Sequence, residues 1–112
     1  MNLRNILDPI KARATYVIRT RFHHRVGYPT DWWEERKTSE AGFQQTAADI
    51  LANQIARPLQ VVGFDLQSGR CWDASRDVAQ AVLDGAEQPL AQDALDFVEQ
   101  HVGIRAAREA AE

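Results

Sequence analysis

The chain has 112 residues, 45% of them hydrophobic, and a formal net charge of −3 at neutral pH. That length fits a single domain with its own core, and one cysteine excludes an intrachain disulfide and any zinc site built on several cysteines. No apolar run approaches the ~20 residues of a membrane span and the N-terminus lacks a signal-peptide pattern, so we expect no membrane partner and a cytoplasmic location.

The charges are unevenly distributed along the chain. Residues 1–28 hold six basic residues and one carboxylate (formal charge +5), whereas residues 38–112 hold five arginines and twelve carboxylates (formal charge −7). We divide the predicted single domain, 1–112, into a basic N-terminal helix at 1–28, an acidic body at 29–103 and a polar, alanine-rich tail at 104–112. The segregation fits either internal neutralisation or a two-sided surface that meets a charged partner.

The first element predicted is a helix over about residues 9–25. Apolar residues recur at spacings of three and four through residues 3–18, and Asp8 followed by Pro9 is typical of a helix start. Residues 15–22, TYVIRTRF, also alternate and are rich in strand formers, so a third strand is the competing interpretation. We favour the helix because the three-four spacing persists through the preceding turns.

Two further helices are expected before the middle of the chain. Asp31 followed by Glu34 has the form of a capping box, which predicts a short helix at about 32–37. A longer helix is expected from about 40 to 56, with Pro58 ending it.

Residues 59–74 are predicted to form an antiparallel β-hairpin around a turn at 67–70. This turn sets Leu66 opposite Cys71 and Asp65 opposite Trp72. The face expected in the core carries Val62, Phe64, Leu66 and Cys71, and the wetter face carries Val61, Asp65 and Trp72. A three-residue loop would instead move Trp72 to the core side.

Two more helices are predicted after the hairpin, one from Ser75 to Gly85 and one from Pro89 to Gly103. The predicted order is therefore α-α-β-β-α-α. We expect an α+β fold in which a central two-stranded hairpin is packed by four or five helices, because such a ribbon is marginal alone in water.

The residues that most often carry chemistry form no recognisable catalytic pattern. His23 and His24 are adjacent, so on a helix they point about 100° apart and make a poor metal site. Arg70 adjoins Cys71, but successive strand residues point to opposite faces, so Cys71 is expected to be a buried structural residue. The acidic row between 93 and 99 fits the wet side of an amphipathic helix. We therefore expect no catalytic residue, cofactor or metal, and a protein that is not an enzyme.

The tryptophans indicate a surface that binds another protein. Trp32 and Trp33 stand side by side after a turn, and Trp72 lies on the wetter face of the predicted hairpin. The expected function is that of a regulatory protein, an adaptor or inhibitor, acting by stoichiometric contact. The residues predicted to make this contact are Trp32, Trp33, Trp72 and Asp65. Self-association through the hairpin edge or the terminal helices stays open.

The alternative function is nucleic-acid binding by the arginine-rich first helix. The candidate contacts to nucleic acid or to an acidic partner are Arg13, Arg19, Arg21, His23, His24 and Arg25. Arginine suits phosphate and the interleaved aromatic residues can stack on bases. The acidic net charge counts against this alternative.

Overall fold

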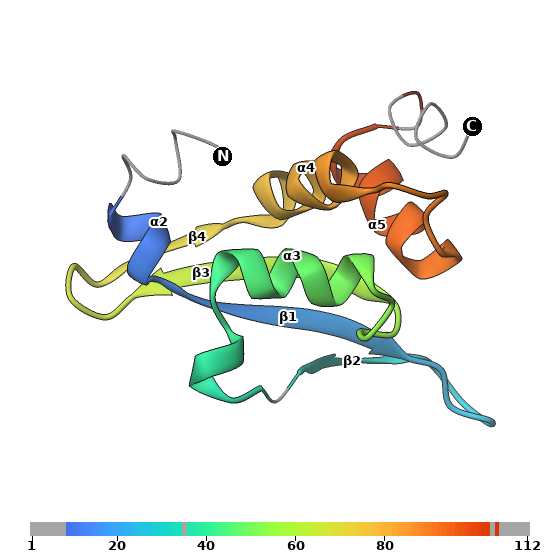
Figure 1. Ribbon diagram of the computed structural model, residues 1–112. Coiled ribbons are helices and arrows are strands. Elements are labelled where there is room, and N and C mark those ends of the chain that lie inside the picture. Colours follow the sequence, from blue (N-terminus) through green and yellow to red (C-terminus); the bar gives the residue numbers. More distant parts are fainter. Residues whose placement is uncertain (1–8, 35, 104, 106–112) are drawn as a thin grey trace.

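A computed structural model of the chain describes residues 9–34, 36–103 and 105 (Figure 1). It contains a four-stranded antiparallel sheet in the order β2-β1-β3-β4. The strands are β1 (Thr15–Phe22), β2 (Thr30–Trp33), β3 (Pro58–Asp65) and β4 (Arg70–Asp73). The helices are α2 (Pro9–Arg13), the 3-10 helix η1 (Thr38–Glu40), α3 (Phe43–Leu51), α4 (Ser75–Gly85) and α5 (Gln92–His101).

The strands and two of the helices form a pair of ββα units that share one sheet (Figure 1). β1, β2 and α3 make the first unit, and β3, β4 and α4 make the second. In each unit a strand of eight residues pairs with a strand of four. The two long strands meet at the centre, with Ile18 opposite Val61, and the short strands form the two edges.

Helices α3, α4 and α5 cover one face of the sheet, and the core lies between them and the strands (Figure 1). Ile18 and Val61, the central pair, are fully buried, as are Val78 and Val82 of α4. Burial alternates along β1 and β3, so successive residues face the helices and the opposite side in turn. Among the described helices, none is long and apolar enough to cross a membrane.

The predicted fold is wrong in its sheet and in the order of its elements. Residues 15–22 are strand β1, not the continuation of a helix from Pro9, and residues 30–33 are strand β2, not the start of a short helix. The described order is α-β-β-α-β-β-α-α, with η1 before α3, instead of a lone hairpin among helices. The strand interpretation of 15–22 prevails because β2 and β3 pair with it from both sides.

The second hairpin, β3–β4, also differs from its prediction. Its loop is Leu66–Gly69, so Asp65 lies opposite Arg70 and Trp72 lies opposite Gly63. The residues that share a face were grouped correctly by their period of two, but the face assigned to the core is the wrong one.

The buried face of β3 carries Val61, Gly63 and Asp65, whereas Leu66 and Cys71 are exposed. A small and an acidic residue can occupy the core side because each has a partner there. Asp65 binds Arg13, and Gly63 makes room for aromatic rings.

Gly63 is the position at which two aromatic rings pack against the sheet. A Cβ atom added there would lie 2.8 Å from Trp72 Cε2 and 2.8 Å from Tyr16 Cε1. The rings of Tyr16 and Trp72 meet edge to face with centroids 6.1 Å apart, and Tyr16 also meets Phe43 of α3 at 5.5 Å. Trp72 is therefore packed against the core, on the side of the hairpin that was expected to be wet.

We predict that G63A destabilises the fold by about 1–3 kcal/mol, because the added methyl overlaps two rings that the core holds in place. The measurement is the free energy of unfolding from urea titration. G42S is the matched control, since a Cβ at Gly42 meets nothing within 4 Å and serine is a favourable N-cap for α3. Equal stability of G63A and wild type would contradict this packing.

Candidate functional site

Exposed apolar side chains gather on the first hairpin, β1–β2, and the segment that joins its strands. Five of the six large apolar side chains that are exposed in the described residues lie between residues 22 and 33. They are Phe22, Val26, Tyr28, Trp32 and Trp33, and their exposed fractions range from 52% to 90%. We call residues 22–33 the aromatic hairpin. It extends beyond the helical layer at the end of the sheet (Figure 1).

The local structure of the aromatic hairpin follows from a few side-chain contacts. Gly27 adopts a positive φ of 102° in the connecting segment, a conformation that favours glycine. Thr30 Oγ1 accepts a hydrogen bond from Trp32 Nε1 at 3.0 Å and lies 2.7 Å from His24 Nε2. The ring of His24 meets Phe22 edge to face at 4.9 Å. These contacts satisfy the polar atoms and leave the apolar surfaces of the rings accessible.

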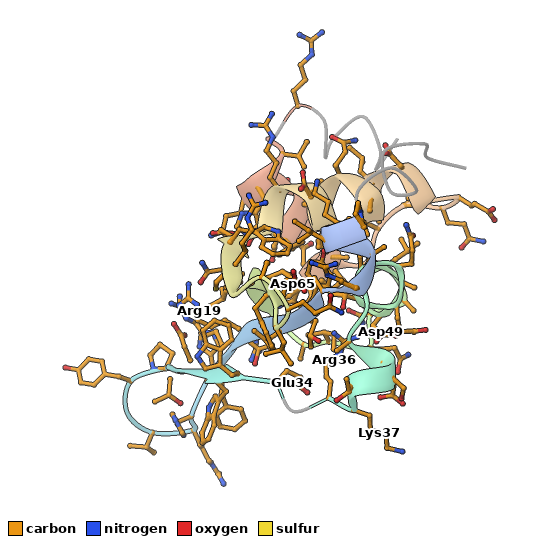
Figure 2. All side chains as sticks on the ribbon, turned by 90° about the vertical axis from the view of Figure 1, so that its left-hand side faces the viewer. Arg19, Glu34, Arg36, Lys37, Asp49 and Asp65 are labelled. Carbon is orange, nitrogen blue, oxygen red and sulfur yellow. The ribbon has the colours of Figure 1, made fainter. Side chains whose placement is uncertain are left out.

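Trp32 and Trp33 lie on opposite faces of the sheet because they are consecutive residues of a strand. Trp32 is opposite Thr20, which is buried on the helix side, and Trp33 is opposite Arg19 on the other side. Figure 2 shows Arg19 on the side of the sheet away from Arg36 and Asp49, which meet beside α3. Both indoles are about half exposed because β2 is an edge strand.

Asp31 forms ion pairs with two of the arginines that were predicted to contact nucleic acid. Its Oδ2 lies 2.6 Å from Arg19 Nη1, and its Oδ1 lies 3.0 Å from Arg21 Nε. The hydrogen bond from Arg21 is the main cause that lowers the pKa of Asp31 below its usual value. The segment 21–34 holds two arginines, one aspartate and one glutamate, so its formal charge is zero.

Arg13 is also paired, and its partner is the buried Asp65. Arg13 donates to both carboxylate oxygens, through Nε at 2.9 Å and Nη2 at 2.8 Å. Ser68 Oγ donates to the same carboxylate at 2.6 Å, which closes the β3–β4 loop. Arg13 and then Ser68 hold the pKa of Asp65 far below its usual range. Asp65 is only 3% exposed, so it anchors α2 and the loop and offers no surface to a partner.

The remaining predicted contacts are divided between the tip and the base of the aromatic hairpin. His23, His24 and Arg25 are exposed, and within the described residues Arg25 makes no ion pair. His23 lines a polar cleft of about 280 Å³ together with Arg21 and Arg57, and Asp93 and Asp96 of α5 line its other side. The cleft mixes both signs of charge and brings together no nucleophile and base.

Val26 and Tyr28 of the aromatic hairpin were missed by the sequence analysis, and Phe22 was considered only as an aromatic residue that could stack on bases. Their signal was present in the alternation of residues 15–22, which predicts a hairpin when it is read as a strand followed by a Gly-Tyr-Pro turn. The predicted helix over 9–25 placed the same residues at or just beyond a helix end, so their exposure on a hairpin was not expected.

The described residues contain no group of three histidine, cysteine or carboxylate side chains that could hold a metal ion. Comparison with protein-family models, curated proteins and solved structures finds no match. Function is therefore inferred from the geometry of this chain alone.

We predict that D65N lowers the free energy of unfolding at neutral pH and flattens its dependence on acid. Because the pKa of Asp65 is lower in the folded chain than in the unfolded one, the ion pair adds stability above about pH 4 and loses it as the pH falls further. The measurement is thermal unfolding between neutral pH and about pH 2.

The control is D77N, which removes an exposed carboxylate that pairs with Lys11 and should cost little. Acid denaturation of D65N that follows the same profile as wild type would contradict the role of this pair.

Proposed function

We propose that the protein is a non-enzymatic, cytoplasmic regulatory protein that holds another protein on its aromatic hairpin, as a stoichiometric adaptor or inhibitor. The observation that supports this function is the concentration of exposed apolar side chains between residues 22 and 33. Exposed apolar patches with polar borders commonly mark contact sites, and tryptophan and tyrosine are frequent anchors in protein interfaces.

Strands β1 and β2, which form the base of the aromatic hairpin, are well suited to hold such anchors in place. β1 pairs with β3 over residues 15–20 and with β2 over residues 19–22, and the two arginine bonds of Asp31 join β1 to β2. A surface that is already ordered loses less conformational entropy on binding. Of the residues first expected to contact a partner, Trp32 and Trp33 belong to this surface, whereas Trp72 and Asp65 pack into the fold.

The charge pattern favours a protein over nucleic acid as the partner. Binding to a phosphate backbone requires positive charge that is available to the phosphates. Arg13, Arg19 and Arg21 are each bonded to a carboxylate, and the aromatic hairpin has no net formal charge.

We predict that the double variant V26S/Y28S loses the partner while keeping the fold. Both side chains are about 90% exposed, so their removal costs little stability, but it removes apolar area from the tip. The measurement compares proteins retained by immobilised wild type and variant from extracts of the native cells, quantified by mass spectrometry.

L66S is the matched control, because Leu66 is 84% exposed on the loop of the other hairpin and should not contribute. Identical capture by wild type, V26S/Y28S and L66S would refute the proposed role of the tip.

We also predict no mobility shift of single-stranded or duplex nucleic acid at low salt, since Arg19 and Arg21 of β1 are held by Asp31 within the fold. Gel-shift titration across ionic strength checks this, with R25A as the comparison because Arg25 has no ion pair in the described residues. A salt-sensitive shift that R25A reduces would instead support the nucleic-acid alternative.

A further inference from the structure

The outer edge of β2 presents backbone groups with no partner in the described part of the chain. The Glu34 N–H, just after β2, donates to the Ile18 carbonyl at 2.8 Å, so the backbone groups of Glu34 point toward β1. Hydrogen-bonded and non-bonded residues alternate along an antiparallel pair, so the backbone N–H and C=O groups of Trp32 and Thr30 also point toward β1. The N–H and C=O groups of Asp31 and Trp33 therefore point outward.

The hydrogen bonds on the far side of β1 agree with this alternation. Arg21 lies opposite Asp31, and its N–H donates away from β2, to the Arg57 carbonyl at 3.2 Å. The pair Arg21–Asp31 is thus a non-bonded pair of the β1–β2 ladder. β2 forms the lower border of the sheet in Figure 1.

We propose that this edge pairs with the same edge of a second copy of the chain, about a twofold axis that passes beside Trp32. Asp31 then lies opposite the partner subunit's Trp33, and each of these two pairs exchanges both of its N–H···O=C bonds. Trp32 lies opposite the partner subunit's Trp32, in a non-bonded pair where side chains approach most closely. The product is one continuous eight-stranded sheet with four new backbone hydrogen bonds.

This register is selected by the edge itself. A shift by one residue would place groups that already bond β1 opposite the outward groups of the second copy. An axis at Asp31 would keep only two of the bonds and would set two carboxylates opposite each other. Only the axis at Trp32 uses every outward group and pairs the two half-exposed indoles.

The charges on the uncovered face of the sheet suit the same arrangement. Asp31 already binds Arg19 and Arg21, so covering its carboxylate does not leave that carboxylate unpaired. The partner subunit's Trp33 lies beside this cluster, where a guanidinium and an indole attract each other. A second copy thus supplies the aromatic surface that each cluster faces.

The other sheet edge, β4, lacks these features. Its indole, Trp72, turns inward over Gly63 and meets Tyr16. Asp73 accepts a hydrogen bond from Gln60 and another from the N–H of Ser75, so its carboxylate serves the fold. Pairing through β4 would join no exposed aromatic residues.

This inference rests on the proposed function only in treating the aromatic hairpin as a contact surface. The tip with Val26 and Tyr28 lies outside the paired strand and remains available to a different protein. Because the paired strand is short, the interface lies at the small end of known interfaces, and the dimer should be reversible.

Sedimentation velocity over a wide range of protein concentration tests the proposal with the full chain. W33P removes the outward N–H of residue 33 and leaves the β1 ladder complete, since proline is tolerated on the open side of an edge strand. W33S removes the indole and keeps the N–H. C71P is the matched control, because Cys71 has the corresponding outward position on β4. Circular dichroism verifies that each variant is folded.

We expect wild type and C71P to dimerise with rising concentration, W33S to dimerise at least several-fold more weakly, and W33P to remain monomeric. A wild type that is monomeric at every concentration overturns the proposal. Dimerisation of W33P equal to wild type, or loss of the dimer in C71P, overturns it as well.

If W33P is unfolded, oxidation of W32C/C71S decides the question. Residues directly opposite in a non-bonded pair lie at ~4.5 Å between Cα atoms, within disulfide range. A covalent dimer supports the register, and its absence refutes it. The two proposals remain distinguishable: a monomer that captures a protein through its tip refutes only the dimer, and a dimer whose V26S/Y28S variant captures normally refutes only the tip.

Discussion

The pairing of β1 with β3 determines which side of every strand meets the helices. Directly opposite residues of an antiparallel pair share a face, and the central pair, Ile18 and Val61, is fully buried beneath the helical layer. The registers of the edge strands with β1 and β3 then determine which of their side chains point toward the helices. Trp72 lies on the helix side of the sheet, and Trp33 lies on the opposite side. The exposed aromatic surface of the protein is thus a consequence of one strand pairing at its centre.

The same constraint explains why the second hairpin misled the sequence analysis. The alternation through residues 59–66 identified the two groups of side chains, but side-chain type alone favoured Phe64 over Asp65 for the core. The partner that makes Asp65 a buried residue is Arg13, which is 52 positions away in the sequence. Likewise, Gly63 appears featureless until Tyr16 and Trp72 are placed over it. Long-range partners of this kind cannot be seen in a local pattern.

Residues 15–22 show the same limit at the level of secondary structure. Their strand-forming residues were recognised, and the apolar spacing before them favoured a helix instead. These residues form a strand and not a helix because β3 pairs with β1 residue by residue from Thr15 onward. The predicted helices at 75–85 and near 90–102 did not depend on such partners, and α4 and α5 lie within those ranges. The adjacent tryptophans lie on an edge strand beyond the helices, which leaves both exposed.

The two ββα units provide an internal comparison that bears on function. In the second unit, a four-residue loop bonded to Asp65 closes the hairpin and the indole of its short strand packs inward. In the first unit, the connection spans residues 23–29 and both indoles of the short strand are exposed. The shared topology shows that a hairpin at this position can bury its aromatic residue. Exposed apolar groups and bare strand edges promote aggregation, and the open form of the first hairpin is therefore the feature on which the proposed contact with a partner rests.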